Sequence, residues 1–321
     1  MVDAYLDDRI RTVSAAFVLA AGGSRYRRHW SSIQQAARDA LMAAAGHPLV
    51  ELMGREVGPE RAFLAYGHVL QLSPPPSFLL ASEKVPAYLY ALPKLFKAGF
   101  GDLLVSFYQQ ADLPGFWKST QSHWETAAVL VRQILAEHQV SQGFDRWCHG
   151  VTLKVVVDPL ALQDAVCPTA PGCLTYLVGG SVLDRLRLSE TESYVLALNI
   201  LLEGIRLAAA KTVRENPAGA DPIRVKLRDH GLNQAFVTNF PHWLDRVVEL
   251  IARTIASYHA EEFLPTSALQ GYLTHQDRVV GPGVIAALRQ CLLQTSLYQD
   301  LDRGQNGADD LPLFRAVSPV L

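Results

Sequence analysis

Residues 196–213, LALNILLEGIRLAAAKTV, decide how the rest of the chain is interpreted. The run is apolar on almost every helical face, which predicts a long core helix. Its centre, LLEGIR, nevertheless carries Glu203 and Arg206. Helical residues three apart face each other, so the two side chains can form an ion pair. The alternative is that both belong to a polar stripe on the helix surface.

A third charge occurs in a similar setting. Glu249 lies in RVVELIARTI (246–255), part of the next long helical segment. An isolated buried charge is costly, so charges on mostly buried helices require partners. We therefore predict a buried or half-buried network of Glu203, Arg206 and Glu249.

Composition limits the classes of partner. The chain has 321 residues, of which 49% are hydrophobic and 19% charged, and its net charge is −2. These values are typical of a soluble globular protein and argue against nucleic acid or an anionic membrane as partner. We find no uninterrupted apolar run of about 18 residues that would span a bilayer. The first residues are acidic where a secretion signal would be basic, which favours the cytoplasm.

The four cysteines match no zinc-finger spacing and form no dense disulfide framework. We expect free thiols, with a Cys167–Cys173 bridge as the alternative.

Periodicity predicts a mainly α (α+β) fold. Helical spacing runs through 4–72, SPPPS at 73–77 marks a loop, and a second helical block covers 85–140. VTLKVVVDPL (151–160) and CLTYLVGG (173–180) predict strands, which we expect to pair antiparallel. Helices are expected again at 191–214, 241–262 and 283–301. We predict one domain, 1–321, with a helical amino-terminal half (1–145), a small central sheet (146–189), a helical half (190–302) and a loosely held tail (303–321).

Two other patterns suggest different chemistry. FVLAAGGSRYRR (17–28) is similar to the glycine-rich opening of nucleotidyltransferases, which would make the chain a nucleotide-binding transferase through Gly22 and Gly23. That motif requires a strand at 13–20, where the spacing predicts a helix that ends at the glycines. His242, Asp245 and Glu249 share one helical face and could bind a metal or form an exposed polar face.

The order of segments along the chain resembles a known family. A long apolar helix, a break, and a second helix reading W-x-x-x-x-x-E-x-x-x-R resemble the ligand helices of gluzincin-type metallopeptidases. The chain is more narrowly similar to a bacterial family of zinc peptidases (HExxH…E) with a helical amino-terminal half. LLVSFYQQADLPGFWKSTQSHWETAAVLVRQIL (103–135), the two strands, and HWLDRVVELIARTIASY (242–258) resemble that family's segments in the same order.

The resemblance implies a zincin-like helical domain with a degenerate metal site. In the family, two histidines of H-E-x-x-H bind zinc and the glutamate activates water. Glu203 aligns with that glutamate and Glu249 with the carboxylate ligand, but Leu202 and Arg206 occupy the histidine positions. Leucine has no donor atom, and arginine keeps its proton.

We therefore hypothesise that Arg206 takes the place of the metal by salt bridging to Glu203 and Glu249. The chain would then be a non-catalytic pseudo-peptidase that needs no cofactor and binds or regulates a protein or peptide partner. The alternative is an active metallohydrolase that holds zinc through His242 and Glu249 with His230 or His259.

Overall fold

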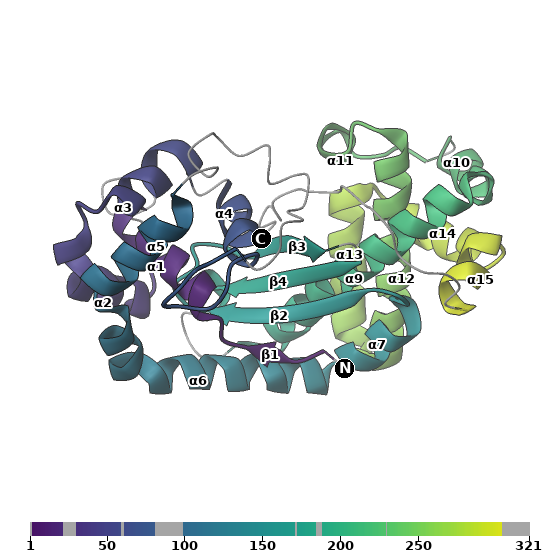
Figure 1. Ribbon diagram of the computed structural model, residues 1–321. Coiled ribbons are helices and arrows are strands. Elements are labelled where there is room, and N and C mark those ends of the chain that lie inside the picture. The colour runs from purple at the N-terminus through teal and green to yellow at the C-terminus, as the bar shows by residue number, and fades with distance from the viewer. Residues whose placement is uncertain are drawn as a thin grey trace. The chain divides into compact units, whose positions relative to one another are not determined.

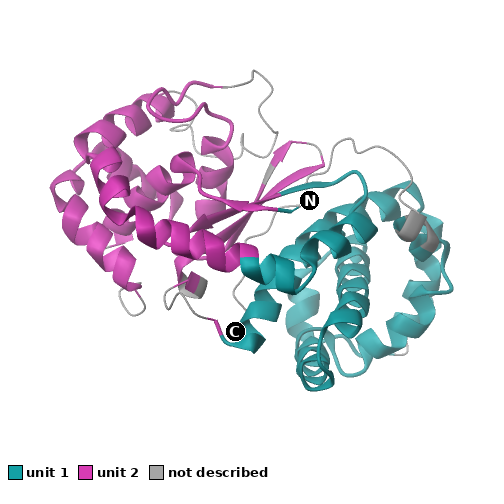
Figure 2. Cartoon of the chain, turned by 90° about the horizontal axis from the view of Figure 1, so that it is seen from below, with its two compact units in different colours: residues 1–2, 133–153, 189–311 teal, residues 3–132, 154–188, 312–321 magenta. Residues whose placement is uncertain are grey.

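The computed structural model describes residues 2–21, 30–58, 61–80, 99–170, 172–183, 188–228 and 230–303. The chain divides into two compact units (Figure 2). Unit 1 comprises residues 1–2, 133–153 and 189–311, and unit 2 comprises residues 3–132, 154–188 and 312–321. Each unit is assembled from separate stretches of sequence, so its limits do not coincide with the segments 1–145, 146–189 and 190–302. The expected tail lies, from residue 304 onward, outside the described residues.

Unit 2 contains a small mixed sheet with the strand order β1-β2-β4-β3. The strands are β1 (Ala4–Tyr5), β2 (Thr152–Asp158), β3 (Ala165–Ala170) and β4 (Cys173–Gly179). β1 runs parallel to β2, and β3 runs antiparallel to β4 with Val166 opposite Tyr176. In Figure 1 the arrows of β2 and β4 point in the same direction.

The expected antiparallel pairing of the strands at 151–160 and 173–180 is therefore wrong. The antiparallel partner of β4 is β3, which the sequence analysis did not predict. Its sequence, AVCPTA, is short and contains Pro168, which weakens a strand pattern. Proline is tolerated there because β3 is the last strand in the sheet order.

The described part of unit 2 also contains α-helices. They are α1 (Asp8–Ala21), α2 (Ser32–Leu41), α3 (Pro48–Leu52), α4 (Ala62–Val69), α5 (Phe100–Gln110), most of α6 (Leu113–Glu137) and α8 (Gly180–Leu183). α2 begins at a capping box in which the Ser31 and Gln34 side chains bind each other's backbone amides. The buried core includes Phe17, Phe107 and Trp124. The helical pattern predicted for 4–72 is confirmed for most of the described residues but is wrong at Ala4–Tyr5, which form β1. The helix expected around 85–98 lies outside the described residues.

Unit 1 is helical. It contains α7 (Val140–Trp147), α9 (Glu190–Glu215), α10 (Asp221–Arg228), α11 (Gln234–Asn239), α12 (Trp243–Phe263), α13 (Thr266–Val280), α14 (Val284–Leu292) and α15 (Ser296–Arg303). The predicted helices at 191–214 and 241–262 correspond to α9 and α12, while the segment 283–301 forms two helices. α12 packs against α9, α13 and α14, and Figure 1 shows α9, α12 and α13 side by side.

α13 was not predicted. Its buried side chains are Tyr272, Gln276 and Val280, spaced four residues apart on one face. A glutamine in the middle of this stripe interrupts the apolar period that identifies amphipathic helices.

α9 is the only helix of the described residues that is long and apolar enough to cross a membrane. Its most apolar window is 72% buried inside the protein. Both Glu203 and Arg206 on this helix form ion pairs with other protein groups. These properties are those of a core helix.

Candidate functional site

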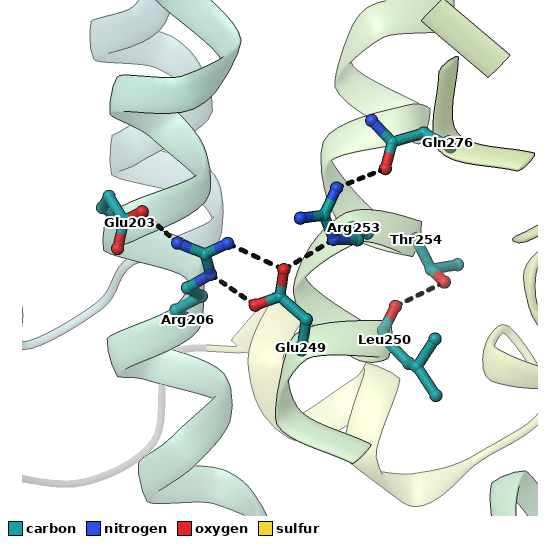
Figure 3. A network of polar contacts seen from close by, with 7 residues as sticks. All are labelled: Glu203, Arg206, Glu249, Leu250, Arg253, Thr254 and Gln276. Carbon is teal, nitrogen blue, oxygen red and sulfur yellow. Dashed lines mark hydrogen bonds and ion pairs between the residues drawn. The ribbon is translucent and has the colours of Figure 1, made fainter. Parts of the chain in front are cut away.

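Charged side chains in the middle of α9 and α12 meet in one cluster, which also includes a glutamine of α13 (Figure 3). We define this ion-pair centre as Glu203, Arg206, Glu249, Arg253 and Gln276. Arg206 donates from Nε to Glu249 Oε2 at 2.5 Å and from Nη2 to Glu249 Oε1 at 2.7 Å. Its third donor, Nη1, binds Glu203 Oε1 on the same helix. The guanidinium thus binds Glu249 through two parallel hydrogen bonds and Glu203 through a third, an arrangement that matches the fork geometry of arginine.

Two further residues complete the centre. Arg253, one turn after Glu249, donates from Nε to Glu249 Oε1 at 2.5 Å and from Nη1 to Gln276 Oε1 on α13 at 2.7 Å. The sequence predicted a network of Glu203, Arg206 and Glu249 but not the participation of these two residues. The spacing of Glu249 and Arg253 by four residues was a usable signal for an additional ion pair. Gln276 gave no comparable signal because it lies on a helix that was not predicted.

The carboxylates of the centre are buried, whereas Arg206 is partly exposed to solvent. The Glu249 side chain is 2% exposed, whereas that of Arg206 is 26% exposed. Burial alone would raise the pKa of Glu249, but the charges of Arg206 and Arg253 and their hydrogen bonds outweigh it and lower the pKa to about 2. Glu249 is therefore a permanent carboxylate at neutral pH.

Glu203 behaves differently. Burial raises its pKa above the usual range and the nearby Glu249 carboxylate adds to this, although Arg206 and Arg253 oppose the shift. The Arg206 guanidinium donates one of the described hydrogen bonds to Glu203, whereas Glu249 accepts three from Arg206 and Arg253. The two carboxylates therefore have opposite pKa shifts within one centre.

Gly204, in the middle of LLEGIR, lies where α9 comes close to α7. A Cβ atom on this residue would lie 2.4 Å from Phe144 Cε2 and 2.9 Å from Cys148 Sγ. Phe144 lies on α7 and Cys148 is the C-cap of that helix, which packs on α9. One face of this turn of α9 thus carries charges toward α12, and another lacks a side chain so that α7 can approach.

The residues of the centre do not fit a zinc site. Leu202 is buried and apolar, Arg206 is a permanent cation, and both oxygens of Glu249 already accept hydrogen bonds from guanidinium groups. Within the part of the chain that the structure describes, no group of three or more His, Cys, Asp or Glu residues could hold a metal ion.

The alternative ligand set is not brought together. His242 is exposed at the N-cap of α12, while Glu249 is buried against two arginines. His259 is buried, with Nε2 at 3.2 Å from the carbonyl oxygen of His138. His230 lies in the bend after α10.

The nucleotide-binding alternative lacks the strand that it requires before the glycines. The strand that it requires at 13–20 is part of helix α1, and Gly22 and Gly23 themselves lie outside the described residues. The Cys167–Cys173 bridge is absent, since all four cysteines are free thiols. Cys167 lies opposite Thr175 in the β3–β4 ladder and Cys173 lies opposite Ala170.

Comparison with family models, with curated proteins and with solved structures finds no match to this chain. The centre must therefore be interpreted from its own geometry.

Proposed function

We propose that this chain is a non-catalytic, zincin-like protein that acts by binding or regulating a protein or peptide partner. In this proposal the ion-pair centre is structural, and Arg206 takes the place that a metal ion holds in an active peptidase. The observation that carries the proposal is the guanidinium of Arg206, which binds carboxylates from α9 and α12 at once.

The charge balance supports this substitution. Two carboxylates facing each other across α9 and α12 would leave buried negative charge if no cation lay between them. Arg206 supplies a fixed cation with directed donors, and Arg253 supplies a second one. With Leu202 and Arg206 at the two positions that align with histidine ligands, the ion-pair centre has no set of donors that would hold zinc for catalysis.

The location and the partner class remain part of the same proposal. A net charge of −2 gives no overall attraction to nucleic acid or an anionic membrane. Four free thiols are the normal state of cysteine in a reducing compartment, so we place the protein in the cytoplasm.

Zinc content and peptidase activity test the proposal directly. The purified chain, incubated with zinc and then dialysed, should retain far less than one zinc per molecule and should not hydrolyse casein. Stoichiometric zinc that is lost in Glu249→Gln or His242→Ala, together with casein hydrolysis, would establish the active metallohydrolase instead.

A gain of metal binding tests the proposed origin of the centre. The double substitution Leu202→His and Arg206→His restores two histidines four residues apart beside Glu203 and Glu249. We expect this variant to retain one zinc per chain, because three ligands would then converge. Adding Glu249→Gln to the same background is the matched control and should abolish retention. A folded double variant that binds no zinc would show that the centre does not have zincin geometry.

A further inference from the structure

A groove opens at the carboxyl-terminal end of α12, in unit 1. Its volume is about 380 Å³. It is lined by Arg146, Tyr258, Glu261, Glu262, Arg289, Gln290, Leu293 and Tyr298, which come from α7, α12, α14, α15 and the turn between the last two. None of these residues belongs to the ion-pair centre.

The aromatic side chains hold the groove in shape. The Tyr258 and Tyr298 rings pack edge to face with their centroids 6.0 Å apart. Tyr258 donates its hydroxyl to the carbonyl oxygen of Arg289 at 2.5 Å, and the Arg289 guanidinium lies 5.1 Å from the Tyr258 ring centroid. The Arg146 guanidinium stacks in the same way, 4.4 Å from the Trp147 ring centroid. Both arginines are thus positioned before any partner arrives.

The groove carries two ion pairs, so its positive and negative charges balance. Arg146 Nη1 binds Glu262 Oε1 at 2.7 Å, and Arg289 binds Glu261. Both glutamates are about half exposed, so each pair contributes little to the stability of a single chain. Each carboxylate uses one oxygen for its arginine, and the other oxygen has no hydrogen-bond partner among the described residues. Further donors could therefore bind without breaking either pair.

We propose that this groove is an interface with a second copy of the same chain, related by a twofold axis. A twofold interface places the same patch of both copies face to face, so the patch must be complementary to itself. Two guanidiniums and two carboxylates give this patch equal numbers of positive and negative charges, so a cation of one copy has a carboxylate to bind on the other. A partner of single charge sign would instead meet one repelling charge for each attracting one.

The exposed apolar surface of the groove and the low net charge of the chain also favour association of two copies. Leu293 is 49% exposed on the wall of the groove and offers an apolar contact beside two tyrosines. Tyrosine and arginine are enriched in protein interfaces and dominate their binding energy. The net charge of −2 gives little long-range repulsion between copies. This proposal does not depend on the ion-pair centre and would stand if that centre proved to be catalytic.

Sedimentation equilibrium of the full chain tests this interface, from low micromolar concentrations to about 1 mM. We expect a concentration-dependent dimer. Leu293→Asp should weaken dimerisation at least about tenfold, because it places a charge in the apolar part of the interface. Leu244→Asp is the matched control. Leu244 is 50% exposed but lies 17 residues before Glu261 on α12, about 25 Å away along the helix.

Charge reversal separates the paired arrangement from nonspecific association. Arg146→Glu and Glu262→Arg should each weaken the dimer, and the chain carrying both should recover it because the pairs are re-formed with opposite polarity. A wild-type chain that stays monomeric over the whole range overturns the proposal. So does a dimer that Leu244→Asp weakens as much as Leu293→Asp, or one indifferent to charge reversal.

Discussion

Replacing Glu249 by glutamine removes the carboxylate of α12 that accepts hydrogen bonds from Arg206 on α9 and from Arg253 on α12. The pKa of this carboxyl falls from a reference value of 4.5 to about 2 in the folded chain. Because one pKa unit corresponds to about 1.4 kcal/mol, the ionised carboxylate contributes about 3 kcal/mol to folding at neutral pH. Glu249→Gln should therefore lower the free energy of unfolding by about 3 kcal/mol at pH 7.

The same shift fixes the sign of the pH dependence. A carboxyl whose folded pKa is depressed stabilises the protein above its unfolded pKa, and this contribution is lost as the pH falls toward the folded pKa. For Glu249 the window runs from 4.5 down to about 2. The penalty of Glu249→Gln should shrink by about 1 kcal/mol between pH 7 and pH 3.5.

Urea unfolding followed by far-ultraviolet circular dichroism measures both quantities, and Glu203→Gln serves as the comparison. The pKa of Glu203 is raised by burial, so its ionised form is disfavoured in the fold. Glutamine also keeps the oxygen that accepts from Arg206, so we expect a change within about 1 kcal/mol. Relative to Glu203→Gln, wild type should lose stability as the pH rises through the raised pKa. Equal penalties for the two variants, or a Glu249→Gln penalty that does not change down to pH 3.5, would refute the reasoning.

Three other outcomes follow from the described residues. Gly204→Ala should destabilise the chain by about 1–3 kcal/mol in urea unfolding, because the added Cβ meets α7. Gly271→Ala on α13, where the added Cβ would lie 3.7 Å from the Tyr194 hydroxyl, should instead be neutral or stabilising by up to about 1 kcal/mol. The reverse order would contradict the packing of α7 on α9. Burial raises the pKa of Asp158, at the end of β2, from 3.8 to about 6. As the pH rises from about 4 to above 6, the free energy of unfolding of wild type should therefore fall by about 3 kcal/mol relative to Asp158→Asn. Parallel pH profiles of the two proteins would contradict this prediction. Alkylation should modify the two partly exposed cysteines of the native chain rapidly and all four after denaturation, whereas a thiol count of two in denaturant would reveal a disulfide.

Local spacing was enough to predict α9 and the ion pair on it. Glu203 and Arg206 are three residues apart on a helix with little room for a polar face, and this relation depends only on helix geometry. The high cost of an unpaired buried charge then pointed to Glu249 as a partner. Hydrogen bonds from Arg206 to Glu203 and Glu249 confirm that contact.

Contacts between distant elements could not be predicted in this way. The sequence by itself determined a mainly helical chain, its long core helices and the three charges that must be neutralised together. Only the tertiary structure brought Gln276 of α13 to Arg253, placed β3 rather than β2 antiparallel to β4, and packed α7 against Gly204. The physical reason is that helix and ion-pair periodicities act within a few residues, whereas strand order and helix packing depend on which distant surfaces fill the same space.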